Sequence, residues 1–477
     1  MRGVVVVILA LCLAGCSGSQ VTPLPTAPVA AAYKEVQGNW ITAAPADTLQ
    51  RGAWWKLYED AGLDHLQQQL LANSPDLASA LARYQQAQAA TDAVRSLQSP
   101  TLGALLNVER DRQSERRPLR VLGPQSPDEY ANASLGLSLQ YELDLWGRVR
   151  QQVNAGTAQE QAAQADLAGT RLSLQAQLAD TMITLRGVDQ EVSLLRDTER
   201  AYARAAEMIA HRHRIGIASG LDLARAQTQL ETTRSQLQQV QARRAVLEHA
   251  IAALTGANAS TFSITPKKVS EGVPAIPIGL PSTLLQRRPD IAAAQRRVAA
   301  ANASVGVARS AFFPSVTFNA LGGFQSNDLS QFVAVPNIFW AIGPNLLANL
   351  IDGGRRKVEV TRFEAVMEEV GQNYRSVVLA AFQQVEDQLA LLNHYAQAAA
   401  AERQAVVASQ QALNLATNRY WEGAVSYLEV VTAQTASLQA RRSVLDLTTR
   451  QRRATVQLVR ALGGGWSTEL IEGAAQN

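Results

Sequence analysis

The sequence predicts a mainly helical protein with membrane β-structure, in which long coiled-coil helices are combined with four β-strands per chain. Three observations support this class: a duplicated unit, alternating apolar segments of strand length, and long proline-free stretches with an apolar seam. Ala, Gln, Leu and Arg dominate the composition, while aromatic residues make up only 5% of the chain. Such a mixture is typical of long helices rather than of a thick globular core.

The duplication defines the predicted organisation of the chain. Gly147-Arg148 recurs as Gly354-Arg355, and the motif Arg212-x3-Gly216-x2-Ser219-x-Leu221-Asp222 recurs as Arg419-x3-Gly423-x2-Ser426-x-Leu428-Glu429. Both pairs have the same offset, about 207 positions, which indicates a duplicated unit far longer than a solenoid repeat. We therefore predict a first repeat over residues 61–256, a proline-rich linker over 257–282, a second repeat over 283–463 and a C-terminal tail over 464–477.

The amino-terminal residues predict secretion and a lipid anchor. One arginine precedes a short apolar run, which is typical of a signal peptide over residues 1–15 and too short to span a bilayer. Leu13-Ala14-Gly15-Cys16 is similar to a bacterial lipobox, in which Cys16 becomes the acylated amino terminus. We expect residues 16–60 to form a lipidated N-terminal tether, in which Val21 to Pro45 is rich in Pro, Ala and Thr. The alternative is a plain signal peptide with an incidental cysteine.

Two segments have the alternation of β-hairpins, at residues 100–144 and 314–350. From Tyr130 to Glu142 apolar and polar residues alternate strictly, which places them on opposite faces of a strand. The segments are close to the ~9–11 residues of a tilted membrane strand. Alternation alone also allows a soluble two-sided sheet, but the predicted lipid anchor favours a membrane.

Helices of unusual length follow each hairpin. We predict long helices over 147–214 and 354–421, each followed after a glycine-containing turn by a return helix, over 221–255 and 428–462. The first long helix has a coiled-coil seam with alternating steps of three and four, at Leu174, Leu178, Thr181, Leu185, Val188, Val192 and Leu195. The second has a seam with a step of seven, at Val378, Val385, Leu392, Ala399, Val406, Leu413 and Tyr420. About 66 residues at ~1.5 Å per residue gives a helix of roughly 100 Å.

Four strands are too few to close a membrane barrel, because open sheet edges in hydrocarbon are costly. We therefore expect identical copies to complete the barrel, with eight, twelve or sixteen strands from two, three or four subunits. Narrow helical seams with Ala, Gln and Thr between them suit side-by-side packing in a ring. Together these features predict a tube with a membrane barrel and a helical duct.

The motifs resemble those of the outer membrane efflux protein family, the TolC- and NodT-like channels. The resemblance is carried by the lipobox, the doubled plan of hairpin and long helix, Asp144-Leu145-Trp146-Gly147-Arg148, Asp352-Gly353-Gly354-Arg355 and Arg419-Tyr420-x2-Gly423. It implies a homotrimer with a twelve-stranded transmembrane β-barrel, a periplasmic α-barrel and an equatorial belt. It also implies an exit duct that serves a periplasmic adaptor and an inner-membrane transporter, most simply of the RND type, in the outer membrane.

The resemblance also implies a periplasmic gate at the helix tips. The matching positions are Leu428 and Glu429 in the second repeat and Asp222 in the first. Three Leu428 side chains around a threefold axis would form an apolar constriction, and three Glu429 carboxylates an acidic ring that favours cations. Arg419 and Tyr420 would tether neighbouring tips by hydrogen bonds. The simpler alternatives are that Glu429 and Asp222 only favour helix N-termini and that Leu428 only packs.

Other classes of site are absent from the sequence pattern. Trp146 and Trp340 suit the membrane interface, although either also suits the core of the belt. His211 and His213 face different sides of a helix, so we expect no metal site, and no catalytic constellation or cofactor motif is present. A net charge of +3 and the lack of a nucleic-acid module predict no nucleic-acid partner. We therefore expect no enzyme and no cofactor.

Two alternative functions remain open from the sequence. A duct of the same shape would also serve ABC-type protein secretion. A lipid-anchored periplasmic coiled-coil scaffold would use the hairpins as soluble contacts. The exported compound is not encoded in any motif, because a wide duct selects poorly and the transporter makes the choice.

Overall fold

The computed structural model describes residues 33–34, 53–114, 128–267, 272–274, 276 and 287–464. The predicted signal peptide and Cys16 lie outside these residues, as do most of the tether, much of the linker and nearly all of the C-terminal tail. In the described ranges, none of the helices combines the length and the apolar character that crossing a membrane requires.

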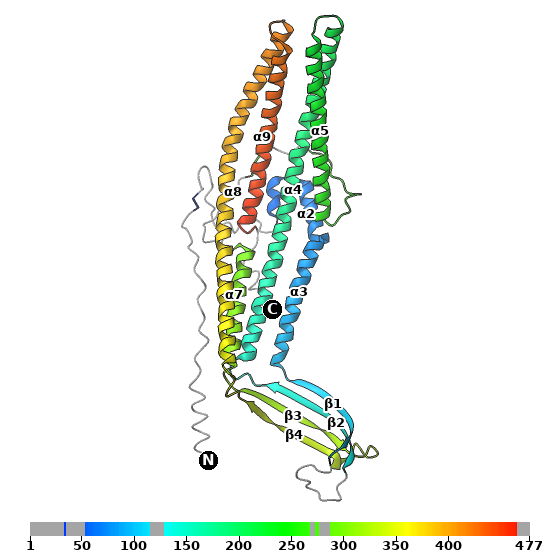
Figure 1. Cartoon of the computed structure of the whole chain (residues 1–477), viewed down its shortest axis with the longest axis vertical. Coiled ribbons are helices and arrows are strands. Elements are labelled where there is room, and N and C mark those ends of the chain that lie inside the picture. Colours follow the sequence, from blue (N-terminus) through cyan, green and yellow to red (C-terminus); the bar gives the residue numbers. More distant parts are fainter. Residues whose placement is uncertain are drawn as a thin grey trace. The chain divides into compact units, whose positions relative to one another are not determined.

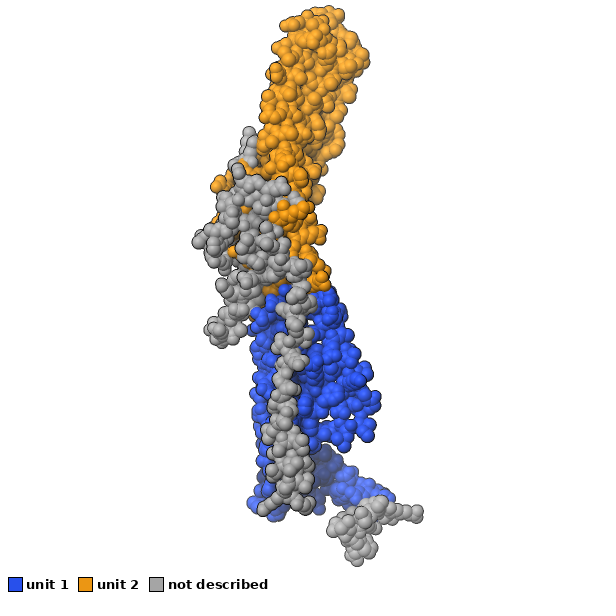
Figure 2. Space-filling model, turned by 90° about the vertical axis from the view of Figure 1, so that its left-hand side faces the viewer, with its two compact units in different colours: residues 1–25, 85–162, 294–374 blue, residues 26–84, 163–293, 375–477 orange. Residues whose placement is uncertain are grey.

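The chain divides into two compact units, which Figure 2 colours separately. Unit 1 comprises residues 1–25, 85–162 and 294–374, and unit 2 comprises residues 26–84, 163–293 and 375–477. Each unit combines residues from both predicted repeats, so the compact units do not follow the division into 61–256 and 283–463. The long helices α4 (Arg148–Arg214) and α8 (Arg355–Trp421) each contribute their first turns to unit 1 and the remainder to unit 2.

Unit 1 contains one antiparallel sheet of four strands in the order β1-β2-β3-β4 (Figure 1). The strands are β1 (Thr101–Arg112), β2 (Glu129–Glu142), β3 (Ser315–Ser326) and β4 (Ile338–Leu347). They lie inside the predicted hairpins, and β2 of the first repeat pairs with β3 of the second. Within the described residues, β1 and β4 are the edges of this sheet.

The register of the sheet aligns its apolar residues on one face. Leu106 pairs with Leu135, Leu135 with Phe324, and Phe324 with Ile338, so one apolar residue from each strand lies in the same row. The face remains exposed in the single chain: Leu106 is 68% exposed and Ile338 is 52% exposed. Other exposed members of this face are Leu102, Val108, Leu137, Trp340, Ile342 and Leu346.

The opposite face of the sheet carries most of its polar side chains. The Asn132 side chain donates to Glu109 Oε1 over 2.8 Å and accepts from Gln325 Nε2 over 2.9 Å, so hydrogen bonds between side chains link three strands on this face. An exposed, continuous apolar face opposite a polar face is unusual for a sheet in water. This two-sided pattern is what a barrel strand needs when one side meets lipid and the other a water-filled lumen.

An aspartate cap joins each strand pair to its long helix. The Asp144 carboxylate accepts from the backbone N–H groups of Val149 and Arg150 at the start of α4, over 3.0 and 2.9 Å. Asp352 does the same at the start of α8, accepting from the N–H groups of Gly354 and Arg356. These caps satisfy amides that the first helical turn leaves free. They give a structural reason for the repeated motifs around Gly147 and Gly354.

Unit 2 contains two helical hairpins. The helix α4 is followed by α5 (Gly220–Leu254), and α8 is followed by α9 (Tyr427–Ala461) (Figure 1). Each of these four helices begins and ends within one residue of its predicted range. The predicted seam is buried: Leu178, Leu185 and Leu195 in α4, and Val378 and Val385 in α8, are each fully enclosed. Most of the stability of such long helices comes from this seam.

Shorter helices complete the fold. In unit 2, α2 (Ala61–Asn73) buries Leu63 and Leu70. The helices α3 (Pro75–Arg95) and α7 (Pro289–Ser310) occupy equivalent positions in the two repeats, and each begins with a proline at its first helical position. The side chains on these helices are small, which allows close approach: Ala165 of α4 and Ala292 and Ala293 of α7 form one buried cluster.

A buried ion network stabilises unit 2 near its amino-terminal segment. Arg186 of α4 contacts Asp60 over 3.1 Å and Asp189 over 3.4 Å, and Arg244 of α5 contacts the same Asp189 over 2.7 Å. Arg186 also donates to the Thr265 carbonyl over 2.9 Å. Because the partners are buried, removal of one charge would leave another uncompensated. The network therefore holds the residues flanking the two repeats against α4 and α5.

Candidate gate at the helix tips

Both hairpins reverse direction through the same turn. In the first tip (residues 212–222), Gly216 has φ of 77°, and the Ile217 N–H donates to the Arg212 carbonyl over 2.8 Å. In the second tip (residues 419–429), Gly423 has φ of 76°, and the Ala424 N–H donates to the Arg419 carbonyl over 2.8 Å. This is a Schellman helix end, which requires a left-handed residue and so favours glycine.

The return helices are capped differently. At the start of α5, Ser219 Oγ accepts from the Asp222 N–H over 3.0 Å. At the start of α9, Ser426 makes no side-chain cap. Asp222 is half-buried and lies 3.9 Å from Arg225, whereas Glu429 is exposed in the first turn of α9. Both acids occupy positions that the helix dipole favours.

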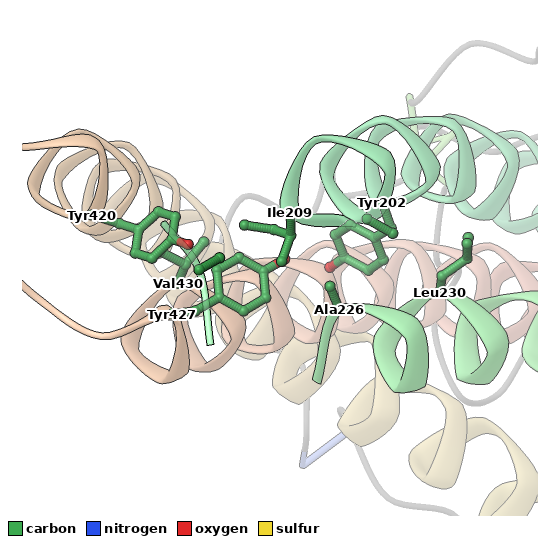
Figure 3. Close-up of a cluster of buried hydrophobic side chains, with 9 residues drawn as sticks. Tyr202, Ile209, Ala226, Leu230, Tyr420, Tyr427 and Val430 are labelled. Carbon is green, nitrogen blue, oxygen red and sulfur yellow. The ribbon is translucent and has the colours of Figure 1, made fainter. Parts of the chain in front are cut away.

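A cluster of buried side chains joins the two tips (Figure 3). Its members come from all four helices and the first turn: Tyr202, Ala206, Ile209, Ala218, Ala226, Leu230, Tyr420, Tyr427 and Val430. The Tyr420 and Tyr427 ring centroids lie 5.3 Å apart, at an angle that presents one ring edge to the other. Burial, more than the nearby phenols and Asp222, raises the pKa of Tyr427 to about 12. The cluster is the apolar contact between the ends of the hairpins.

The predicted gate residues divide between this cluster and the surface. Tyr420 is buried in the cluster, whereas Leu428 is 48% exposed and Glu429 and Arg419 are also exposed. Within the described part of the chain, the Arg419 side chain makes no hydrogen bond or ion pair. The structure therefore brings Tyr420 into contact with the first hairpin. It leaves Leu428, Glu429 and Arg419 facing outward, where a neighbouring subunit or a pore would meet them.

Other residues at the tips take part in the same contacts. Tyr202 and Tyr427 are buried in the cluster, and the Arg212 guanidinium lies over the rings of Tyr420 and Trp421. Arg212 was visible only as the repeat counterpart of Arg419. Its contact joins residues more than two hundred positions apart, which no local pattern reveals.

The two predicted interface tryptophans have different surroundings. Trp146 stacks on Phe313, with centroids 4.9 Å apart, and donates to the Pro314 carbonyl over 2.7 Å. It is half-buried where strands and helices of unit 1 meet. Trp340 is 74% exposed on the apolar face of β4. Of the two, Trp340 has the free ring that an interfacial position requires.

His213 makes a structural contact in the first tip. His213 Nδ1 lies 3.0 Å from the Ala218 carbonyl, across the turn. The His213 ring also packs near Gly220. Gly220 occupies the position that Tyr427 holds in the second tip. This contact supports the first turn from within.

These features define a class of protein: a pair of long helical hairpins attached to a sheet whose exposed apolar face suits a lipid bilayer. The sequence matches the family described as "Outer membrane efflux protein" over residues 66–257 and 280–464. The chain belongs to this family.

Individual relatives match over nearly the full length. The chain is 30% identical to the pyoverdine export outer membrane protein OpmQ of Pseudomonas aeruginosa, with 97% of each protein covered. It is 29% identical to the toluene efflux pump outer membrane protein TtgC of Pseudomonas putida, covering 96% of this chain and 94% of the relative. The crystal structure of the outer membrane protein VceC from Vibrio cholerae matches with a TM-score of 0.81 at 28% identity, covering 87% of this chain and 99% of that chain.

The comparisons confirm the predicted fold class, mainly helical with membrane β-structure, and the predicted family. They also confirm the class of function, because the relatives are outer membrane channels of efflux systems. The chain is thus an outer membrane efflux protein.

Proposed function

We propose that three copies of this chain form the outer-membrane exit duct of a tripartite efflux system. The duct passively conducts small molecules delivered by a periplasmic adaptor and an inner-membrane transporter, most simply of the RND type. The observation that carries this proposal is the incomplete sheet, which among the described residues has four strands, two edges and one exposed apolar face.

The incomplete sheet requires partner strands in a membrane. Unpaired backbone groups at the edges of β1 and β4 have no water to bind in hydrocarbon, so each edge needs a neighbouring strand. Three copies supply twelve strands, with β4 of one copy beside β1 of the next. The apolar face then meets lipid, and the polar face around Asn132 lines the lumen.

The cargo is proposed only as a class. The relative OpmQ is named for pyoverdine export and the relative TtgC for toluene efflux, so similar chains serve different compounds. A passive duct that serves either compound leaves the choice to the transporter. We therefore propose small-molecule cargo without assigning a compound.

The gate is proposed at the second tip. Leu428 and Glu429 are exposed in the single chain and follow the turn directly. Around a threefold axis Leu428 would form an apolar ring and Glu429 an acidic ring. Asp222 would attract cations less strongly than Glu429, because the positive charge of Arg225 lies near it. Arg419 and Tyr420 belong to the same gate, Tyr420 through the ring cluster and Arg419 through the neighbouring subunit.

Acylation of Cys16 is part of the proposal. The Leu13-Ala14-Gly15-Cys16 motif supports it, and several acyl chains give stable attachment where one chain gives marginal binding. Metabolic labelling with palmitate should mark the wild-type protein and leave Cys16→Ser unlabelled. Equal labelling of both proteins would contradict the assignment.

A pair of adjacent substitutions tests the membrane sheet. Leu137 lies on the apolar face and Ser138 on the opposite face of β2. We expect Leu137→Lys to abolish the membrane-inserted oligomer, since a lysine facing lipid costs about 2–4 kcal/mol per strand. Ser138→Lys should insert normally and change only the conductance. Native mass spectrometry in detergent and conductance in planar bilayers measure these outcomes.

If Leu137→Lys and Ser138→Lys inserted and conducted alike, the assignment of the sheet to the membrane would be overturned. A wild-type protein that stayed monomeric in detergent and gave no conductance would overturn the duct itself.

A further inference from the structure

We propose that Arg212 is the positioning residue that keeps the gate closed, by clasping the second tip from the first tip of the same chain. This inference rests on the proposed duct and names a residue outside the predicted gate. The clasp is a cation–π contact to Tyr420 and Trp421.

The geometry of the contact is specific. The guanidinium carbon of Arg212 lies 5.5 Å from the Tyr420 ring centroid and 5.0 Å from the Trp421 ring centroid. The two rings lie 5.6 Å apart in an edge-on arrangement, so one guanidinium addresses both faces. A cation within about 6 Å of an aromatic ring is attracted by the ring quadrupole, most strongly by tryptophan.

The backbone of Arg212 places its side chain for this contact. The Arg212 carbonyl accepts the N–H groups of Ile217 and Ala218, over 2.8 and 3.2 Å, and thereby ends α4. The same residue fixes the first turn through its carbonyl and reaches the last turn of α8 through its guanidinium. Movement of one tip relative to the other must therefore separate the guanidinium from the rings.

Two opposing effects act on the clasp. Arg212 Nε is buried and has no hydrogen-bond partner among the described residues. A buried donor without a partner opposes the contact between the two tips, because separation of the tips returns water to Nε. The ring contacts stabilise closure while the unpaired Nε favours release, which suits a gate that must open under a partner's binding energy.

The repeat provides an internal contrast. Arg419 occupies the same position in the second turn, and its carbonyl accepts from Ala424 in the same way. Its side chain is exposed, however, and within the described residues it packs on no ring. The second turn has rings for a cation to contact, whereas His213 stands in the first turn at the position of Tyr420. One arginine of the duplicated pair therefore clasps the opposite tip.

The test compares two charge-matched variants in planar bilayers. Arg212→Gln removes the clasp, and Arg204→Gln removes an exposed arginine two turns earlier on α4. We expect Arg212→Gln to raise the open fraction of the channel about tenfold. We expect Arg204→Gln to match the wild type and Arg212→Lys to fall between them. Trp421→Leu alone should raise the open fraction above that of the wild type. The double variant Arg212→Gln/Trp421→Leu should open little more than Arg212→Gln.

A second measurement does not depend on conduction. Amide hydrogen exchange in the peptides that contain the two turns should accelerate in Arg212→Gln and stay unchanged in Arg204→Gln. Equal open fractions and equal exchange in the two variants would overturn the clasp while leaving the duct intact. A channel that never conducts, but whose tip exchange still accelerates in Arg212→Gln, would support the clasp and overturn the proposed duct.

Discussion

The first and second tips have one backbone and two different side-chain environments. Gly216 and Gly423 take the same left-handed conformation, and the Arg212 and Arg419 carbonyls accept equivalent hydrogen bonds. Around this common turn, the first tip has a side-chain cap, in which Ser219 accepts from the Asp222 N–H, and an acid that lies 3.9 Å from Arg225. The second tip lacks the side-chain cap and depends instead on aromatic packing.

The two tips share the residues that fix the backbone of the turn. They differ in side chains that the backbone does not require, and these side chains are available for function. The position held by Gly220 in the first tip is held by the buried Tyr427 in the second. The acid beside it is half-buried near Arg225 in the first tip and exposed in the second. The two tips thus share the turn, while the second tip has a buried aromatic residue, Tyr427, and an exposed carboxylate, Glu429. A gate needs both features, one to set its position and one to face the pore.

The largest effect is expected at Tyr427, a buried aromatic residue of the second tip. Tyr427→Ala should weaken closure of the tips by about 3 kcal/mol, because it removes a large buried ring from the cluster. Leu428→Ala, at the exposed neighbour, should change local stability by less than about 0.5 kcal/mol. Residue-resolved hydrogen exchange around α8 and α9 measures both values. Similar losses in the two variants would show that the cluster does not anchor the second tip.

The capping difference should give an intermediate effect. Ser219→Ala removes the acceptor for the Asp222 N–H and should destabilise the first turn of α5 by about 1 kcal/mol. Ser426→Ala should cost only a few tenths of that, since Ser426 makes no side-chain cap. Exchange of the Asp222 and Glu429 amides reports each site separately. An equal effect at the two serines would remove the proposed asymmetry in capping.

Periodic features of the fold were predictable from the sequence. The seven-residue step through Val378, Val385 and Leu392 predicted a buried seam, and all three side chains are buried. The alternation around Leu135 predicted an apolar face, and the register extends that face over four strands. Such patterns are local, because one helix or strand repeats the same contact along its length.

Contacts between distant segments were not predictable. The Arg212 clasp depends on two turns that are adjacent only after both hairpins have packed. The stacking of Trp146 on Phe313 likewise joins the end of one strand pair to the start of the other. The compact units differ from the sequence repeats for the same reason, since helices from both repeats pack together. The gate residues were located by family resemblance, and the roles of Leu428 and Glu429 stay predictions.

The smallest expected effect concerns the two acids that follow the turns. Glu429→Gln should lower the cation preference of the open channel about threefold, because an exposed ring of carboxylates attracts cations into a pore. Asp222→Asn should have a weaker effect, since Arg225 lies 3.9 Å from that carboxylate. Reversal potentials in a salt gradient measure the preference, and high ionic strength should reduce the difference because exposed charges are screened. A larger shift for Asp222→Asn would place the narrow acidic ring at the first tip, and the assignment of the gate to the second tip would be wrong.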